Sequence, residues 1–399
     1  MNSRRTRRLI SVSLCSLALV ASACGGDDDD EATATTAAGA SADTTAAAAT
    51  DAPSETTAAA TEATSDTTDG ASESTAAADG AEAEAALADL VAAAEAEGSV
   101  TVYSSQGLDQ LNALAAAFQE KYPGISVEVV RGTDGDTIPR VETELATNTS
   151  GGDLIVMAAD AFMQTNAEAG NFVDPTASPQ LAGLGAYDAE QYMHEGNYFE
   201  VGAAVLTFAW NTNDVPDGLT DYDDLLVPEL AGGRIAVIDP AIGPAVVDFY
   251  LWMEESFGQD YIEALAAQEP RIYPSALPIG EALSSGEVSA AAYAAPVQLV
   301  PAAESGAPVD FGISPAGAWG ARYYGAIPKS SDSPNAAALL ADFMVTAEGQ
   351  ELVQGASGSV LPDIPGTLIT NDRVRKIDLE ATAPDKAAAF VEEWNALFR

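Results

Sequence analysis

The chain has 399 residues, of which 61 are acidic and 16 basic, so its formal net charge at neutral pH is −45. A charge of this size argues against nucleic acid and anionic membrane surfaces as partners, because both would repel the protein. Two origins of the charge stay open: a saline habitat, in which surface carboxylates keep proteins soluble, or a cationic ligand that the field attracts.

The N-terminal segment has the features of a secretory leader. Arginines at its start precede an apolar run over residues 9–20, which is too short to span a bilayer. The Ser-Ala-Cys sequence ending at Cys24 resembles a lipobox, in which the cysteine is diacylated. We expect a signal peptide at 1–23, lipidation at Cys24 and an extracytoplasmic, membrane-anchored protein of the cell envelope; the alternative is cleavage without a lipid. Because Cys15 leaves with the leader, no free thiol would remain for catalysis or metal binding.

Residues 25–85 consist almost entirely of Ala, Thr, Ser, Gly, Asp and Glu, without an aromatic or a β-branched aliphatic residue. Such a composition cannot bury enough apolar area to offset the entropy of ordering the chain. We therefore expect residues 24–85 to form a lipidated N-terminus followed by a disordered linker.

From residue 86 on, helical and strand patterns alternate. Helical spacing of apolar residues predicts helices that end at Gly98, at Pro123 and near Leu145. Short apolar runs predict three strands, over residues 100–103, 125–130 and 153–157. Repeated β-α-β units imply right-handed crossovers and a doubly wound sheet. In such sheets ligands bind outside the carboxyl ends of the strands, so the loops there are the expected site.

Motifs throughout the body resemble those of one family. They occupy residues 102–107, 118–125, 153–156, 209–212, 223–226, 228–235, 239–240, 273–275, 286–288, 306–309 and 348–352. Together they resemble the extracellular solute-binding proteins of the ferric-binding type, over nearly the whole body. Members of this family serve different solutes, so the resemblance does not identify a ligand.

The resemblance implies an α/β, two-lobed periplasmic-binding-protein-like type II fold. Each lobe would be a doubly wound sheet, and two crossing strands, at 203–211 and 318–327, would join the lobes. The C-terminal helices would pack back on the first lobe. We accordingly expect lobe 1 at 86–212 and 316–399, and lobe 2 at 213–315.

The resemblance also implies a function. Such proteins capture a small solute by hinge closure and deliver it to an ABC permease and its ATPase. A tethered sensor without transport would share all of these features and stays as an alternative. We expect a monomer, with no cofactor and no nucleic-acid partner.

Iron recognition in the family uses a His, a Glu and an adjacent Tyr pair. The matching positions here hold Gly107, Ala158, Pro296 and Val297. Phenolate and carboxylate oxygens suit a hard trivalent cation, so their absence argues against iron bound in that way. We expect no metal site, with a ferric-ion or iron-chelate receptor as the alternative. The sole histidine, His194, lies in a predicted loop and is expected at the surface.

A small organic solute is the preferred ligand. Ser104, Ser105 and Gln106 precede a predicted helix, so hydroxyls and free N–H groups could surround a carboxylate, phosphonate or phosphate. Ser105 could instead cap that helix. Asp160, after the third strand, could pair with an amine or cap the next helix. A zwitterion would satisfy both Ser105 and Asp160.

Further candidates lie on other loops and in the second lobe. Thr133 and Asp134 could hydrogen-bond a ligand or simply form a turn, and Asp239 marks a strand-to-helix junction in the second lobe. The aromatic candidates, which could close over a ligand by stacking or cation–π contact or could belong to the core, are Tyr293, Trp319 and Tyr324.

Catalysis is not expected. With no cysteine nucleophile in the mature chain and a single histidine, a catalytic triad is improbable. Neither a phosphate-cradling glycine loop nor a nucleotide-binding fingerprint occurs. The sequence therefore favours a binding protein over an enzyme.

Overall fold

The computed structural model describes residues 70–399, with side chains from residue 80 onward. The predicted signal peptide at 1–23, the lipidation site Cys24 and the linker up to residue 69 lie outside the described residues. Within the described part, no helix combines the length and the apolar character that crossing a membrane requires.

The described chain contains α-helices and short 3₁₀ helices. The α-helices are α1 (Gly70–Glu97), α2 (Leu108–Lys121), α3 (Asp134–Thr147), α4 (Asp160–Glu168), α5 (Ala189–Tyr192), α6 (Pro244–Phe257), α7 (Gln259–Ala267), α8 (Ala276–Ser285), α9 (Pro296–Glu304), α10 (Pro334–Met344), α11 (Ala347–Gln354) and α12 (Pro384–Phe398). The 3₁₀ helices are η1 (Tyr222–Leu226), η2 (Pro228–Leu230), η3 (Pro240–Ile242) and η4 (Asn371–Arg373).

Eight of the described strands pair along one path, in the order β2-β1-β3-β11-β6-β9-β7-β8, and the other strands pair at its sides. Their bounds are β1 (Ser99–Ser104), β2 (Ser126–Arg131), β3 (Leu154–Met157), β4 (Phe172–Val173), β5 (Met193–His194), β6 (Tyr198–Asn211), β7 (Ile235–Ile238), β8 (Arg271–Tyr273), β9 (Ala290–Ala294), β10 (Val309–Phe311), β11 (Trp319–Pro328), β12 (Gly358–Ser359) and β13 (Ile369–Thr370).

The first lobe forms around the parallel strands β1, β2 and β3. All four residues of β3 are buried, as the continuous apolar run predicts for a strand with both faces covered. On α2, the helical spacing buries Leu111, Leu114 and Phe118. The predicted elements of this lobe are therefore confirmed.

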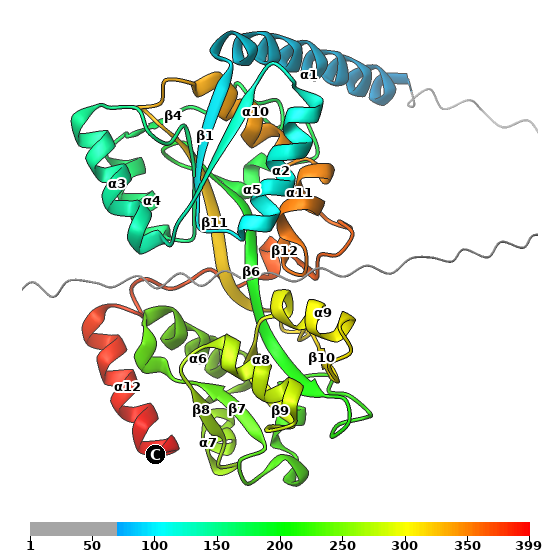
Figure 1. Cartoon of the computed structure of the whole chain (residues 1–399), viewed down its shortest axis with the longest axis vertical. Helices are drawn as coiled ribbons and strands as arrows, with labels where there is room; N and C mark the ends of the chain where they lie inside the picture. The colour runs from blue at the N-terminus through cyan, green and yellow to red at the C-terminus, as the bar shows by residue number, and fades with distance from the viewer. Residues whose placement is uncertain (1–69) are drawn as a thin grey trace, which may run out of the picture. The chain divides into compact units, whose positions relative to one another are not determined.

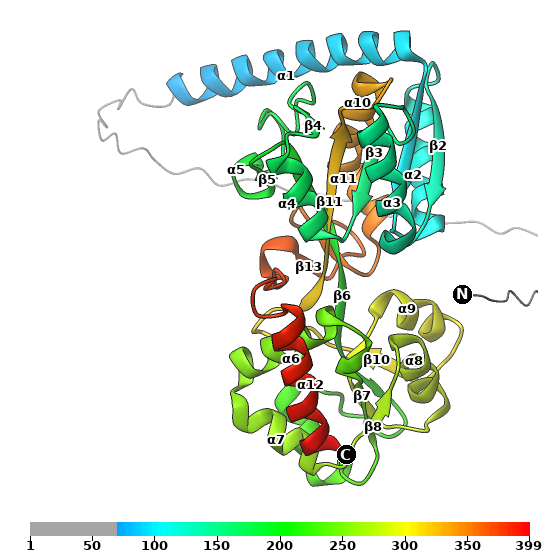
Figure 2. The ribbon, with the colours of Figure 1, turned by 90° about the vertical axis from the view of Figure 1, so that its left-hand side faces the viewer.

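Two long strands, β6 and β11, pass from the first lobe into the second (Figure 1, Figure 2). They pair antiparallel with each other, and β11 also pairs with β3 of the first lobe. The end of β6 pairs with β9 and β10 of the second lobe. These are the two crossing strands that the family resemblance implies, and the type II architecture is confirmed.

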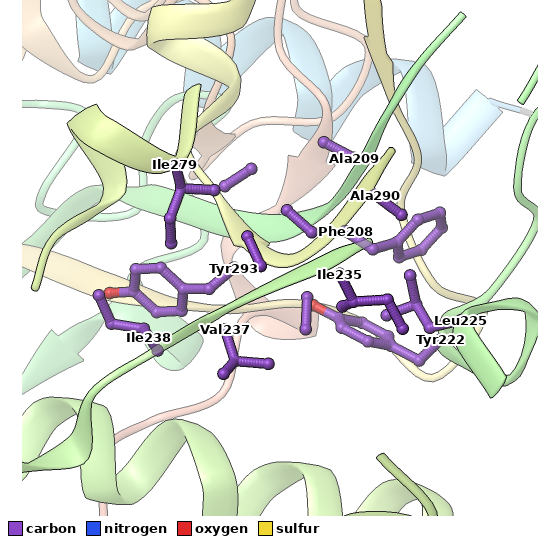
Figure 3. Close-up of a cluster of buried hydrophobic side chains, with 14 of the residues drawn as sticks. Phe208, Ala209, Tyr222, Leu225, Ile235, Val237, Ile238, Ile279, Ala290 and Tyr293 are labelled. Atoms are coloured by element: carbon purple, nitrogen blue, oxygen red, sulfur yellow. The ribbon is translucent and has the colours of Figure 1, made fainter. Parts of the chain in front are cut away.

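The second lobe is built on the parallel strands β7, β8 and β9. Its core gathers apolar side chains from these strands, from β6 and from the surrounding helices. Figure 3 shows Phe208 of β6, Tyr222 of η1, and Ile235 and Tyr293 of the lobe's own strands in this cluster. The second lobe therefore has a hydrophobic core that includes side chains of both crossing strands.

The expected linker is wrong for residues 70–85, because α1 begins at Gly70. This stretch is rich in Ala and Glu, which are among the best helix formers. The C-terminal part of α1 packs on α10 and buries Leu90 and Ala94. The linker prediction was based on the lack of core-forming residues. It did not take into account the helix propensity of Ala and Glu or the packing of α1 on α10.

The expected place of the last helix is also wrong. Helices α10 and α11 contact α1 and α2 of the first lobe, but α12 packs on α6, α7 and η3 of the second. The physical reason is an aromatic stripe at helical spacing, in which Phe390, Trp394 and Phe398 meet Tyr250 of α6. The family motifs end before this helix, so they carried no information on it. The remaining lobe limits stay a prediction.

Asp248, on α6, is fully buried and joins three parts of the chain. Its carboxylate accepts hydrogen bonds from Trp319 Nε1 at 2.8 Å, Arg375 Nε at 3.1 Å and the Asp378 backbone N–H at 3.0 Å. Trp319 begins the crossing strand β11, and the other two residues lie on the segment that leads to α12. One buried carboxylate therefore holds β11 and the C-terminal segment to the second lobe.

Replacing Asp248 by Asn should lower the free energy of unfolding by roughly 3–5 kcal/mol, because it removes the fully buried carboxylate and leaves the half-buried Arg375 guanidinium with only the exposed Glu255 as an ionic partner. Glu255→Ala is the matched control, because this carboxylate binds the same guanidinium but is 64% exposed. Its loss should cost less than about 1 kcal/mol. Urea denaturation followed by tryptophan fluorescence measures both, and equal losses in the two variants would contradict the assignment.

Candidate functional site

The loops after β1, β2 and β3 open at one edge of the first-lobe sheet, because β1 pairs in parallel with both neighbours. Two cavities lie there, of about 470 Å³ and about 200 Å³, which we call the larger and the smaller cavity. Both are lined by these loops, by β11 and by a second-lobe helix. The place agrees with the rule that ligands bind beyond the carboxyl ends of parallel strands.

The larger cavity is lined mainly by uncharged polar groups. Ser105 and Gln106 reach it from the loop after β1, Gln298 from α9 of the second lobe, and Gln354 from α11. Its one cationic lining residue is Arg131, at the end of β2. This guanidinium donates from Nε to the Gln106 carbonyl at 3.3 Å and forms no ion pair with any described residue. The larger cavity thus offers an unpaired positive charge and amide groups.

The smaller cavity has the opposite character. Asp134 lines it from the start of α3 and Asp160 from the start of α4. Small residues leave the space open, namely Ala158, Ala245, Gly320 and Ala321. Carboxylates therefore face a compact space between the lobes.

The two cavities adjoin across the crossing strand. Tyr323 lines the larger one and Tyr324 the smaller, as expected for neighbours on a strand, whose side chains point to opposite faces. Ser105 and Asp134 lie next to each other where the cavities meet: burial raises the pKa of Asp134, and the nearby Ser105 hydroxyl partly opposes that rise. No hydrogen bond of acceptable geometry joins the two side chains.

Three polar atoms at this site are buried without a hydrogen-bond partner. They are Ser105 Oγ, Asp134 Oδ1 and Asp160 Oδ1, one from each of the loops after β1, β2 and β3. Leaving a buried polar atom unpaired costs roughly 1–3 kcal/mol, and more for a charged group. Three such atoms at one cleft indicate a place that a ligand or water completes.

Burial raises the pKa of Asp134, and this effect exceeds the opposing influence of the Ser105 hydroxyl and the Ala158 backbone. Burial also raises the pKa of Tyr324 strongly, and the charges of Asp160 and Glu200 add to the effect. The Tyr324 phenol is therefore protonated at neutral pH and can donate a hydrogen bond.

The capping alternative does not hold for Ser105 or Asp160. The N-cap of α2 is Gly107 and that of α4 is Ala159, and neither helix receives a side-chain cap bond. Thr133 does cap its helix: its Oγ1 accepts from the Asp136 N–H at 3.3 Å, and it lines neither cavity. Ser105 and Asp160 are thus free for a ligand, whereas Thr133 is engaged in the turn.

Ser104 shapes the loop and does not reach the cleft itself. Its side chain is fully buried, and its Oγ accepts from the Gln106 N–H at 3.1 Å. That bond turns the chain so that Gln106 lines the larger cavity. Ser104 therefore supports the site from behind.

Two of the second-lobe candidates lie away from the cavities. Asp239 accepts from the Ala241 N–H at 2.8 Å and from Arg399 Nη2 at 2.6 Å, so it caps η3 and ties down the chain end. Tyr293 packs in the core against Phe249, with ring centroids 5.0 Å apart. Neither lines the larger or the smaller cavity.

Trp319 borders the smaller cavity, but its indole is held in place. Its N–H donates to Asp248, and its ring lies 5.9 Å from that of Phe249. Its side chain therefore lines the cavity in a fixed orientation. Of the aromatic candidates, Tyr324 is the one left to contact a ligand directly.

Sequence reasoning missed Arg131 and passed over Tyr323 as a ligand contact. Both could have been found: Arg131 is the last residue of a parallel strand, and alternation along β11 sends Tyr323 and Tyr324 to opposite faces. No sequence signal indicated Gln298 or Gln354, since α9 and α11 reach the cleft only through the packing of both lobes.

A buried ionic network lies behind the smaller cavity. Both oxygens of Glu200 accept from Arg322 Nη1 at 3.0 Å, and Oε1 also meets His194 Nε2 at 3.2 Å. Although burial opposes ionisation, His194 and Arg322 hold the pKa of Glu200 below its usual value. His194 stacks on Tyr198 as well, so the expectation of a simple surface histidine is wrong.

The positions that correspond to the ferric ligands of the family do face the cleft. Gly107 and Val297 line the larger cavity and Ala158 the smaller one, but their side chains carry no oxygen or nitrogen. Across the residues that the structure describes, no three His, Cys, Asp or Glu side chains gather in a way that could hold a metal ion.

Asp134→Asn should stabilise the protein increasingly as pH rises. An unfolded aspartate ionises near about pH 3.9, whereas folded Asp134 keeps its proton to a higher pH, so the wild type loses stability between these two values. The variant avoids this loss. Its melting temperature relative to the wild type should grow as the pH rises above about 3.9, until the folded Asp134 is also ionised. Asp109→Asn, an exposed change in the first turn of α2, is the control; a gap independent of pH would contradict the assignment.

Solved structures share this architecture. A putative extracellular solute-binding protein from Bordetella parapertussis has a TM-score of 0.59 at 18% identity, covering 76% of this chain and 100% of that one. Iron-bound HitA from Pseudomonas aeruginosa has a TM-score of 0.55 at 21% identity, covering 75% and 99%. AfuA from Actinobacillus pleuropneumoniae, with fructose-6-phosphate bound, has a TM-score of 0.52 at 20% identity, covering 75% and 98%. At these identities the likeness shows the fold alone.

Among curated proteins no sequence relative matches the chain. The family model of the bacterial extracellular solute-binding proteins matches residues 100–356, which span both lobes, both crossing strands and all but one lining residue of each cavity. The chain therefore belongs to the bacterial extracellular solute-binding proteins.

Proposed function

We propose that the protein is the receptor of an ABC importer, which captures a small organic solute between its lobes and delivers it to a membrane permease and its ATPase. The family supports the general role. The observation that carries the choice of an organic solute is the set of three unpaired buried polar atoms, on Ser105, Asp134 and Asp160. Closure of the lobes would bring a solute against all three.

The charges of the two cavities favour a solute with both an anionic group and an amine. Arg131, Gln106 and the Ser105 hydroxyl would receive the anionic group, such as a carboxylate or phosphonate, in the larger cavity. The carboxylates of the smaller cavity would receive the other end. A zwitterion thus matches the cleft better than ferric ion, for which the cleft lacks the ligand oxygens of the family.

Thermal unfolding of the full chain, refolded to remove any bound solute, tests this proposal. The panel contains amino acids, aminophosphonates, polyamines, thiamine, sugars and chelated ferric ion. A solute at 100 times its dissociation constant adds about 2.7 kcal/mol of stability, which is a clear rise in melting temperature. We expect a zwitterion to give the largest rise; a rise with iron alone would overturn the proposal.

Ser105→Ala supplies the matched test of the site. It should reduce the rise produced by the identified solute, because a buried hydroxyl of the cleft is lost. Ser126→Ala changes the same residue type at the exposed start of β2, the opposite end of the sheet, and should leave the rise unchanged. If the solute raises the melting temperature of the two variants equally, Ser105 does not take part in binding.

We further propose that Cys24 carries the lipid anchor and that the receptor acts as a monomer. Cys24→Ala should release the protein from the membrane fraction into the medium, which immunoblotting of the two fractions measures. Uptake of the identified solute by cells lacking the protein separates transport from sensing. Undiminished uptake would favour a tethered sensor.

A further inference from the structure

The smaller cavity holds carboxylate oxygens that have nothing to bind. Asp160 is only 3% exposed, its Oδ2 accepts from Gln164 Nε2 at 3.2 Å, and its Oδ1 has no partner. Asp134 Oδ1, on the same cavity, is also buried and unpaired. A buried carboxylate without a partner destabilises a protein unless a cation or a donor completes it.

The cationic residue that lines the smaller cavity cannot supply that charge. Arg322 Nη1 is committed to both oxygens of Glu200 at 3.0 Å, and its Nε and Nη2 donate to the Val374 carbonyl. Arg322 and Glu200 thus neutralise each other behind the cavity. The cavity itself remains negative.

The size of the cavity limits what can enter. A volume of about 200 Å³ equals that of about six or seven water molecules at roughly 30 Å³ each. Its lining also includes the small residues Ala158 and Ala245. Trp319, whose indole is held by a hydrogen bond to Asp248, lines it as well. A compact group with several N–H donors fits this space.

We infer that the smaller cavity is a cation subsite, in which Asp160 and Asp134 bind the protonated amine or amidine end of the solute. Each N–H⁺ would donate to one of the unpaired Oδ1 atoms, and the aromatic ring of Tyr324 adds a surface that attracts cations. The inference rests on the proposed function, because it names the chemistry of one end of the captured solute.

A metal ion fits the subsite less well than an ammonium group. Calcium takes six to eight oxygen ligands, whereas this cavity offers two carboxylates and one phenol among apolar walls. An ammonium group is satisfied by about three acceptors, and a primary amine can use fewer when its tail leads out of the cavity.

The test uses methylammonium, which is small enough to enter the smaller cavity and carries the cationic group without the rest of the solute. The melting temperature of the full chain should be higher in methylammonium chloride than in sodium chloride of equal ionic strength. Asp160→Asn should abolish this difference and Asp134→Asn should reduce it, while the exposed control Asp109→Asn should keep it. No difference in the wild type, or an unchanged difference in Asp160→Asn, would overturn the inference, as would a larger effect of calcium chloride.

A second measurement separates recognition from a structural role. Without ligand, Asp160→Asn should melt at the same or a higher temperature than the wild type, because it removes an unpaired buried charge. A residue that merely held the fold would instead lower the melting temperature when changed, and that result would count against the subsite.

The solute panel keeps this inference distinct from the function on which it rests. If a solute without an amine raises the melting temperature of the wild type and of Asp160→Asn alike, the protein still binds solutes but the cation subsite is wrong. If no organic solute binds and chelated iron does, the proposed function itself fails.

Discussion

The antiparallel ladder between β6 and β11 is the interaction on which the rest of the structure depends. These strands carry the chain out of the first lobe and back: β11 joins the first lobe's sheet through β3, and β6 joins the second lobe's sheet through β9. The ladder also supplies the floor of the cleft, since Tyr323 and Tyr324 of β11 face the two cavities. The strand that joins the lobes therefore also lines both cavities, so in the proposed receptor a movement of the lobes would change the shape of the cleft.

The cleft separates charges that elsewhere in the chain are paired. Arg322 and Glu200 satisfy each other behind β11, and Arg375 joins Asp248 in the second lobe. Arg131 and Asp160, by contrast, form no ion pair with any described residue and line different cavities. Unpaired opposite charges on the two sides of one strand impose an orientation on any solute that spans the cleft, because turning it end for end would bring like charges together.

Much of the fold follows from local patterns, whereas the site follows only in part. Alternating helical and strand patterns predict the elements from β1 to α3. The position of Ser105, Asp134 and Asp160 in loops after the strands is enough to make them candidate site residues. Asp239 and Tyr293 could not be judged from the sequence, because capping by one and core packing of the other depend on contacts with distant segments. The place of α12 likewise depends on tertiary packing that composition does not encode, whereas the helix at residues 70–85 agrees with the helix propensity of Ala and Glu.

The packing of α12 on the second lobe has a consequence for how motion could be observed. The described chain enters through α1, which packs on the first lobe, and ends at α12 on the second. The two ends of the folded part therefore pack on different lobes, so a movement of one lobe against the other would change their separation. A donor dye near residue 98 and an acceptor at the C-terminus would read out the opening angle of single molecules without touching the cleft.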